Sequence, residues 1–337
     1  MKNGAKFVIV DPCLMVPPAM KLLESIGTVV WAPEKNQKKL GIQVRGATVI
    51  ITEFNRITES VIESARGTLR GIVVYGVGYN HIDVNAATKR GIYVANCKGS
   101  NAESVAEFTF SLMLDLSKRT HVADRFIRHG RWRDLHKMPV VLKGSELSKK
   151  TLGLVGMGEI GRRVARIARG FNMRILVFDP YLSSESIVQN GAEPADLRTL
   201  LKEADYVSLH IPLSDETEGF LGDAEIELMK PTAHLINTAR GALVNEKALL
   251  RALRKKRIAG AGLDVFSKEP LPQHSPFLEL DNVIMAPHIG ALTQEALSAM
   301  SLMSAEESVR IARGEAPINL INREVKGKSV TSRSRKG

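Results

Sequence analysis

Cysteine, aromatic residues and long apolar runs are all scarce in this chain, and each scarcity excludes a class of protein. With only Cys13 and Cys97, the sequence cannot build a disulfide framework or a zinc site from cysteine alone, so we expect no metal site. No apolar run approaches the roughly 18 residues that cross a bilayer, and the N-terminus lacks the apolar core and cleavage site of a signal peptide. We therefore expect a cytoplasmic protein without a membrane partner.

The positive net charge raises the question of nucleic-acid binding. The formal net charge is +11, but aromatic residues make up 5% of the chain and no known reading module is present, which disfavours a nucleic-acid groove. Much of the excess lies in the tail, residues 323–337, which lacks apolar periodicity and is expected to be mobile and solvated. Another basic stretch, Lys118 to Arg133, has the spacing of a solvated helix face. We expect no nucleic-acid partner.

The first hundred residues alternate strand-like and helix-like segments. At 337 residues, with 44% hydrophobic and 25% charged residues, the chain is long enough for two globular domains. The alternation predicts a parallel sheet with helices on both faces. The predicted strands are Phe7 to Val10, Ala47 to Ile51, Gly71 to Tyr75 and Ile92 to Val94, and the predicted helices are Pro18 to Ser25, Thr58 to Ala65 and Val84 to Arg90.

A long helix and a second alternating pattern follow. Asn101 is a suitable N-cap for a helix that runs to Lys118 and connects two domains. From Thr151 the pattern predicts the strands and helices of a doubly wound nucleotide fold. Its six predicted strands lie near 152–155, 174–178, 206–209, 233–236, 260–264 and 283–286.

The end of the pattern suggests that the nucleotide domain is an insertion. A last long helix, Thr293 to Gly314, is expected to return to the first domain. The predicted division is a substrate domain in 1–100, a nucleotide domain in 101–291, a return segment in 292–322 and the basic tail in 323–337. We expect the active site between the two domains, where such pockets prefer to form.

Residues 151–179 contain a complete dinucleotide-binding unit. An apolar run leads into Gly156, Gly158 and Gly161 with G-x-G-x-x-G spacing, followed by an amphipathic helix. The first glycine permits the tight turn, the second lets a pyrophosphate approach the backbone, and the third lets helix pack on strand. The pyrophosphate would lie on the free N–H groups at the helix start. A glycine-rich turn in another α/β protein would not supply these parts in register.

Asp179 points to the identity of the nucleotide. It ends a second β-rich run, Arg174 to Phe178, 18 residues beyond Gly161. An acidic side chain at this position accepts the ribose hydroxyls of NAD and repels the additional phosphate of NADP. The sequence therefore predicts NAD as the cofactor.

Three short motifs, each at the end of a predicted strand, supply chemistry. NTARG, KEP and PHIG contain Arg240, Glu269 and His288. The guanidinium of Arg240 can bind a carboxylate through two hydrogen bonds and polarise the adjacent ketone. His288 would exchange a proton with the ketone oxygen while hydride is transferred, and Glu269 would fix the tautomer and favour the protonated imidazole. Taken alone, each residue is more often structural; their ordered placement behind the fingerprint favours catalysis.

These residues and motifs resemble the D-isomer-specific 2-hydroxyacid dehydrogenase family, which includes phosphoglycerate, glyoxylate and hydroxypyruvate enzymes. The similarity runs from about Ile50 to Ile321. It rests on five blocks: YGVGYNHID, NAESVAE, GLVGMGEIGRRVA, NTARGALVNE, and AGLDVF with KEP and PHIGA. The resemblance implies an α/β fold of two doubly wound parallel-sheet lobes, in which a Rossmann NAD-binding domain is inserted into a discontinuous flavodoxin-like substrate domain. It also implies a homodimer.

The resemblance assigns roles to further residues. It implies that Arg240, Glu269 and His288 act as described above, and that the loop of Gly76, Val77 and Gly78 presents backbone N–H groups to the substrate carboxylate. Asp264 would hold the nicotinamide carboxamide. Asn101 and Glu103 are expected to be structural. The resemblance also implies that six further residues line the cofactor site: Glu159, Ile160, Ile211, Thr238, Ala239 and Gly290.

The identity of the acid is left open by the sequence. Phosphoglycerate relatives hold the phosphate with a basic residue near the loop TEFNR, where this chain has Thr52, with Arg56 further on and Phe54 between. Tyr79 is expected to pack, while Tyr75 could pack or contact the substrate. Glu269 disfavours formate-type relatives, which have glutamine at this position.

The sequence therefore predicts an NAD-dependent oxidoreductase that interconverts a D-2-hydroxy acid and its 2-oxo acid. The alternative is an NAD-sensing regulatory protein, similar to a corepressor, on the same fold. The basic tail alone favours this alternative, and a segment added for expression explains the tail equally well.

Overall fold

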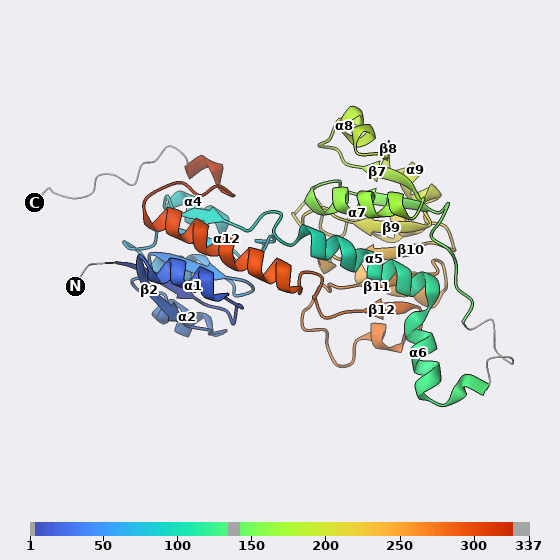
Figure 1. Cartoon of the computed structure of the whole chain (residues 1–337), viewed down its shortest axis with the longest axis horizontal. Coiled ribbons are helices and arrows are strands. Elements are labelled where there is room, and N and C mark those ends of the chain that lie inside the picture. The colour runs from blue at the N-terminus through green and yellow to red at the C-terminus, as the bar shows by residue number, and fades with distance from the viewer. Residues whose placement is uncertain (1–3, 134–141, 326–337) are drawn as a thin grey trace, which may run out of the picture. The chain divides into compact units, whose positions relative to one another are not determined.

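The computed structural model describes residues 4–133 and 142–325, which divide into two compact units (Figure 1). The first contains the chain up to Asn101 and again from Thr293, and the second contains Ala102–Leu292. Among the described helices, none is both long and apolar enough to cross a bilayer. Each unit is an α/β structure built on its own parallel sheet, as the sequence predicts.

The first unit is built on a five-stranded parallel sheet of order β2-β1-β3-β4-β5. This is the flavodoxin-like order. The buried runs of β3 and β4 are almost entirely β-branched, as expected for strands covered on both faces. The strands are β1 Ala5–Ile9, β2 Gly27–Trp31, β3 Val49–Thr52, β4 Gly71–Val74 and β5 Tyr93–Ala95.

Helices cover both faces of this sheet. One face packs against α2, α3 and α4 through a core that includes Leu40, Val61 and Ile62. On the other, α12 packs against β3, β4 and α1, so the chain returns to this unit after the second one. The helices are α1 Pro17–Glu24, α2 Gln37–Gln43, α3 Glu59–Ser64, α4 Val84–Lys89, α12 Gln294–Ala312 and the 3-10 turn η4 Arg323–Val325. Residues 326–337 of the predicted tail lie outside the described residues.

The second unit is built on a seven-stranded parallel sheet of order β12-β11-β10-β9-β6-β7-β8. Strand order reverses beside β6, which is the topological switch point of a Rossmann fold. The strands are β6 Thr151–Val155, β7 Arg174–Phe178, β8 Glu193–Pro194, β9 Tyr206–Leu209, β10 His234–Asn237, β11 Gly260–Leu263 and β12 Val283–Met285.

Two cores stabilise this unit, one on each face of the sheet. One core joins the sheet to α9 and α11, and the other joins it to α5 and α7, which run alongside each other (Figure 1). The helices are α5 Ala102–Lys118, α6 Thr120–Arg128, α7 Glu159–Gly170, α8 Ser184–Gln189, α9 Leu197–Glu203, α10 Asp223–Ile226 and α11 Glu246–Arg254, with 3-10 turns η2 Gly241–Leu243 and η3 Pro276–Glu279.

The structure adds elements that the sequence pattern did not predict and corrects one contact. Strands β2 and β8 and helix α2 are additional. Helix α5 begins after Asn101, but the Oδ1 of Asn101 is buried without a hydrogen-bond partner in the described chain, so the predicted side-chain cap does not form. Glu103 instead forms ion pairs with Arg163 and Arg166 of α7, consistent with a structural role.

Candidate active site

The carboxyl ends of three neighbouring strands hold the polar residues predicted to act on the substrate. Arg240 follows β10, Glu269 follows β11 and His288 follows β12. Since β10, β11 and β12 are adjacent and parallel, these residues reach the same edge of the sheet, where open α/β sheets bind ligands.

His288 and Glu269 form a hydrogen-bonded pair. The Nδ1 of His288 lies 2.7 Å from Oε2 of Glu269, and the side chains are 30% and 35% exposed, so solutes can reach the pair. The other carboxylate oxygen of Glu269 accepts the Phe266 backbone N–H at 2.9 Å. Held at both oxygens, Glu269 fixes the orientation of the imidazole and directs the other ring nitrogen, Nε2, away from the pair.

Glu269 is favoured in its charged form. Burial raises the pKa of this carboxyl, but the hydrogen bonds from His288 and the Phe266 N–H and the nearby charge of Arg240 outweigh burial, so the pKa lies below its ordinary value. Glu269 is therefore ionised at neutral pH and can stabilise a protonated imidazole.

Arg240 approaches this pair from the neighbouring loop. Its side chain is half-buried, and burial lowers the pKa of the guanidinium while Glu269 opposes the shift; a guanidinium remains charged nevertheless. Gly241 explains how its loop packs here, because a Cβ at Gly241 would meet the carbonyl carbon of Phe266 at 2.0 Å. A glycine after Arg240 therefore lets the NTARG loop lie against the chain that carries Glu269.

Asp264 holds the turn that presents His288. Its carbonyl accepts the His288 N–H at 2.8 Å, and its two carboxylate oxygens accept the N–H groups of Ile289 and Gly290, each at 2.8 Å. His288 has a φ of 58°, which non-glycine residues rarely adopt. Asp264 is buried and supports this backbone conformation, and Gly290 is required beside it because a Cβ there would lie 2.9 Å from the carboxylate.

The glycine loop after β6 is shaped to accept a dinucleotide. Gly156 has a φ of 93°, and a Cβ at Gly161 would meet the Gly156 carbonyl oxygen at 2.4 Å, so both are required by the protein backbone itself. A Cβ at Gly158 would meet nothing within 4 Å. Helix α7 starts there without a side-chain cap, which leaves its first N–H groups to a ligand. The loop therefore fits a bound pyrophosphate.

The carboxylate of Asp179 lies beside this loop at the end of β7. One oxygen accepts the Met157 N–H at 2.9 Å and the other accepts the Tyr181 N–H at 3.0 Å. These bonds fix the side chain next to the glycine turn, where a ribose of the dinucleotide would be expected.

The remaining residues predicted to line the cofactor lie around this carboxyl edge. Ile160 and Ile211 are half-buried and pack on the cores of the unit. Thr238 is buried, with its hydroxyl 3.0 Å from that of Thr109, and the Ala239 N–H donates to Asn237 at 3.1 Å. Glu159 forms an ion pair with Arg163 at 2.9 Å.

The loop predicted to bind the substrate carboxylate belongs to the first unit. Gly76 has a φ of 143°, which favours glycine, and its carbonyl accepts the Cys97 N–H at 2.7 Å. The Val77 carbonyl accepts the side chain of Asn96 at 2.7 Å. Within the described chain, the N–H groups of Val77 and Gly78 donate to no acceptor, so they are available to an anion.

The two tyrosines that flank this loop differ in exposure. Tyr75 is 1% exposed, and its hydroxyl lies 2.7 Å from the Leu14 carbonyl and 3.0 Å from that of Leu297, so Tyr75 packs. Tyr79, which was expected to pack, is 40% exposed.

The loop TEFNR, residues 52–56, is held by Asp11, an acid after β1 that the sequence pattern did not single out. Thr52 is buried and donates its hydroxyl to Asp11 at 2.8 Å. The same Asp11 oxygen accepts the N–H groups of Glu53 and Asn55 at 2.7 and 3.2 Å. Because the buried Asp11 carboxylate already accepts these hydrogen bonds, the Thr52 hydroxyl is not available to bind a substrate phosphate.

Comparisons with known proteins show which family this chain belongs to. Residues 110–290 match the family model described as D-isomer specific 2-hydroxyacid dehydrogenase, NAD binding domain. The chain is 41% identical to a glyoxylate reductase of Korarchaeum cryptofilum, over 90% of this chain and 92% of the relative. It is 43% identical to a glyoxylate reductase of Thermococcus litoralis, over 84% and 86%.

A solved structure supports the same relationship. The crystal structure of a glyoxylate reductase from Paecilomyes thermophila matches with a TM-score of 0.86 and 28% sequence identity. The match covers 95% of this chain and 98% of that chain, so it includes both units.

Proposed function

Because the chain belongs to the D-isomer specific 2-hydroxyacid dehydrogenase family, we propose that Arg240, Glu269 and His288 form its reaction centre. The protein is an NAD-dependent oxidoreductase that interconverts 2-hydroxy acids and 2-oxo acids. The observation that carries the proposal is the 2.7 Å hydrogen bond between His288 and Glu269, next to Arg240.

NAD fits the glycine loop, and the proposed contacts follow from it. The pyrophosphate would be held by the uncapped start of α7 across Gly158, and the ribose hydroxyls by Asp179. When bound, the nicotinamide supplies or receives the hydride. Asp264 would hold the carboxamide while it supports the His288 turn.

In the proposed reaction, the protein side chains bind the substrate and transfer the proton. In reduction, Arg240 binds the carboxylate of the 2-oxo acid through two N–H groups and polarises the adjacent ketone. The Nε2 of protonated His288 donates its proton to the ketone oxygen as the carbon gains hydride, so the ketone becomes a hydroxyl and the imidazole becomes neutral. Glu269 stabilises the imidazolium before this step, and the reverse reaction returns the proton to Nε2.

The proposed substrates are small 2-oxo acids, with glyoxylate the first to assay. Similarity to proteins named glyoxylate reductase supports this choice. The buried contact between Thr52 and Asp11 disfavours a phosphorylated acid, since a carboxylate next to the loop would repel phosphate. The N–H groups of Val77 and Gly78 are proposed to contact the substrate carboxylate.

A substrate panel tests the proposal. We expect NADH oxidation with glyoxylate or hydroxypyruvate to exceed that with 3-phosphohydroxypyruvate at equal concentration. Turnover should form the D-isomer wherever the product is chiral. Activity confined to the phosphorylated acid would contradict the assignment of the TEFNR loop, whereas no NADH oxidation with any 2-oxo acid would contradict the reaction centre.

Assembly and location are proposed on separate grounds. A homodimer is proposed from the resemblance to the family, and Ile127 of α6 and Trp132 beyond its end are exposed apolar side chains that it could cover. Light scattering would test the dimer. A reducing, cytoplasmic location is proposed because Cys13 and Cys97 are both free thiols.

The alternative function, an NAD-sensing regulator, depended on the basic tail. Residues 326–337 of this tail lie outside the described part of the chain, and no described contact favours the alternative.

A further inference from the structure

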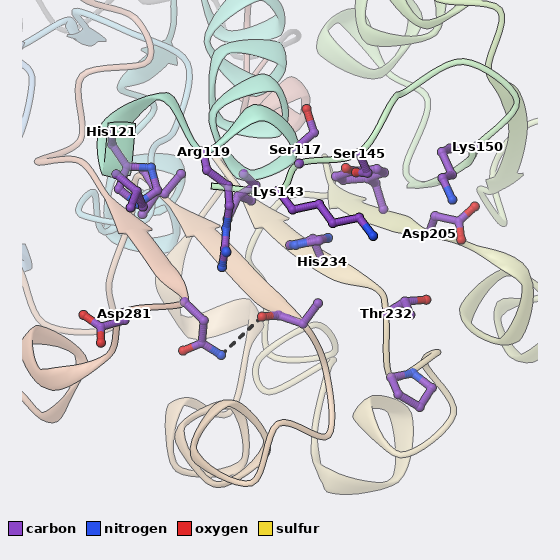
Figure 2. A pocket seen from close by; sticks show the side chains of 18 residues that line it. Ser117, Arg119, His121, Lys143, Ser145, Lys150, Asp205, Thr232, His234 and Asp281 are labelled. Atoms are coloured by element: carbon purple, nitrogen blue, oxygen red, sulfur yellow. Dashed lines mark hydrogen bonds between the residues drawn. The ribbon is translucent and has the colours of Figure 1, made fainter. Parts of the chain in front are cut away.

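A pocket lies at the amino-terminal edge of the seven-stranded sheet, opposite the carboxyl edge that holds His288 (Figure 2). Lys150, Asp205 and His234 line it at or next to the starts of β6, β9 and β10. Strands of four or five residues rise about 3.3 Å per residue, which separates the two edges by roughly 13–16 Å. The pocket has a volume of about 500 Å³, which suits a small organic ligand.

One wall of the pocket is held by well-defined backbone contacts. The Ser145 N–H donates to the Ser117 carbonyl at 2.7 Å, and Lys118 donates to the Ser145 carbonyl at 2.9 Å. A Cβ at Gly144 would meet the same Ser117 oxygen at 2.4 Å, so glycine permits this close approach. These contacts fix the segment that carries Lys143 against the end of α5.

Positive charge dominates the lining. Arg119, Lys143 and Lys150 face two carboxylates, Asp205 and Asp281. Asp205 is already bonded, because it accepts Lys230 at 3.0 Å and the Thr151 N–H at 2.9 Å. In the described chain, neither Lys143 nor Lys150 forms an ion pair. Figure 2 shows the Arg119 and Lys143 side chains extending into the pocket around His234.

Two stacked rings, His234 and Tyr206, form the floor of the pocket, and one buried ring nitrogen of His234 lacks a hydrogen-bond partner among the described residues. The rings of His234 and Tyr206 are stacked, with centroids 5.2 Å apart and an interplanar angle of 14°. Burial, assisted by the charge of Arg119 and opposed by Asp205, lowers the pKa of His234 to about 4. The ring is therefore neutral at neutral pH, and its buried Nδ1 has no hydrogen-bond partner among the described residues.

We infer that this pocket binds a small organic dianion, either a phosphate monoester or a dicarboxylate. Its negative groups would lie between Lys143, Lys150 and Arg119, and its body would lie over the His234–Tyr206 floor. Cations gathered in a concave site repel one another, and a ligand with two negative charges relieves this repulsion better than a monoanion. The site is separate from the reaction centre and does not rest on the proposed function.

Lysine footprinting tests the inference on the native protein. The protein, saturated with NAD so that the glycine loop is filled, is treated with an amine-acylating reagent, and the reaction at each lysine is followed by mass spectrometry. Inorganic phosphate and malonate are the two dianion probes, and acetate at matched ionic strength is the monoanion control. Lys202 and Lys247, which are exposed and lie outside the pocket, are internal controls.

We expect phosphate or malonate to slow acylation of Lys143 and Lys150 about tenfold when the dianion is in tenfold excess over its Kd, since about a tenth of the sites are then free. Lys202 and Lys247 should keep their rates, and the probe that protects identifies the headgroup. The inference is overturned if neither dianion protects, if acetate protects equally, if all four lysines respond alike, or if Lys143 and Lys150 are unreactive without ligand because another copy of the chain covers them.

A charge-matched pair of variants gives an independent measurement. In calorimetric titrations of NAD-saturated protein, K143Q/K150Q should weaken binding of the protecting dianion at this site by about tenfold or more, or 1.4 kcal/mol. K202Q/K247Q makes the same change in net charge and should leave the affinity as it was. Equal losses in the two double variants would show an effect of overall charge and contradict a built site.

Discussion

The carbonyl oxygen of Asp264 accepts the backbone N–H of His288 at 2.8 Å, so a buried residue at the end of one strand positions the proposed acid at the end of the next. The Asp264 carboxylate also holds the two N–H groups that follow, in Ile289 and Gly290. This arrangement maintains the φ of 58° at His288. The position of the imidazole therefore depends on Asp264 as well as on Glu269.

Replacing Asp264 with Asn tests this positioning role. An amide places an NH₂ group against one of the two backbone N–H donors, and losing a hydrogen bond to a charged group costs about 1.5–3 kcal/mol. We expect kcat to fall by about tenfold or more, with a smaller change in KM for the 2-oxo acid. Asp223→Asn, in an exposed ion pair with Arg251, is the control. A lower Tm with kcat unchanged would mean that Asp264 serves folding alone.

Removing the imidazole should remove acid catalysis. In His288→Ala no group remains to protonate the ketone oxygen, so kcat for reduction should fall by roughly 10²–10⁴-fold. His274→Ala changes an exposed histidine outside the reaction centre and should have no such effect. Steady-state NADH oxidation measures both variants, and equal rates for native protein and His288→Ala would exclude this histidine from the mechanism.

The lowered pKa of Glu269 predicts how stability depends on pH, and its charge predicts an effect on activity. Glu269→Gln removes the negative charge hydrogen-bonded to the His288 imidazole, so kcat for reduction should fall. Because the folded-state pKa of Glu269 is lowered, its contribution to stability is present at neutral pH and is lost as pH falls through that pKa. Thermal unfolding of the two proteins should therefore converge below about pH 4, the ordinary glutamate range. A constant difference in Tm across that range would contradict the shift.

Arg240→Lys tests two-point binding of the substrate. Lysine keeps the charge but cannot form the planar pair of hydrogen bonds, so kcat/KM should fall by about ten- to a hundredfold. Arg251→Lys, at an exposed ion pair, should have little effect. If Arg240→Lys retained full kcat/KM for glyoxylate, simple charge attraction would be sufficient.

Asp179 sets the expected cofactor preference. Its negative charge should repel the 2′-phosphate of NADPH, so the ratio of kcat/KM for NADH to that for NADPH should fall about tenfold in Asp179→Asn. The amide retains an acceptor for the Met157 or Tyr181 N–H, so the glycine loop remains supported. Comparable use of both cofactors by the native enzyme would contradict the role of Asp179.

Motifs at the ends of predicted strands indicated which side chains share one edge of the sheet. Arg240, Glu269 and His288 follow β10, β11 and β12, and these three strands are neighbours in the structure. The hydrogen bonds from the His288 turn to Asp264 and the close packing of Gly241 on Phe266 are contacts between backbone or side-chain atoms of different loops. Contacts of this kind leave no periodic signal in a sequence.

The elements that the pattern missed have physical reasons to be weak in sequence. Strand β8, Glu193–Pro194, has two exposed residues at a sheet edge, where proline is tolerated. Helix α2, Gln37–Gln43, contains Gly41, which disfavours helix locally but permits packing, since a Cβ there would lie 2.8 Å from the Ser64 hydroxyl. Strand β2 is an edge strand with exposed positions on both faces. In each case tertiary packing outweighs local preference.

Two glycines of the nucleotide loop should differ in how substitution by alanine affects stability. A Cβ at Gly161 would press on the Gly156 carbonyl at 2.4 Å, so Gly161→Ala should destabilise the protein by about 1–3 kcal/mol and lower Tm even without NADH. A Cβ at Gly158 would meet no protein atom within 4 Å, so Gly158→Ala should leave Tm unchanged.

Gly158→Ala should instead affect NADH binding. Because the open space at Gly158 is where the pyrophosphate is proposed to approach the backbone, Gly158→Ala should raise the Kd for NADH by about tenfold or more. Fluorescence titration of NADH on the folded variant measures this, with Gly170→Ala as the control, since a Cβ there also meets nothing within 4 Å and lies at the other end of α7. If Gly158→Ala bound NADH as the native protein does, the pyrophosphate could not lie against Gly158, and the dinucleotide would have to contact a different part of the loop.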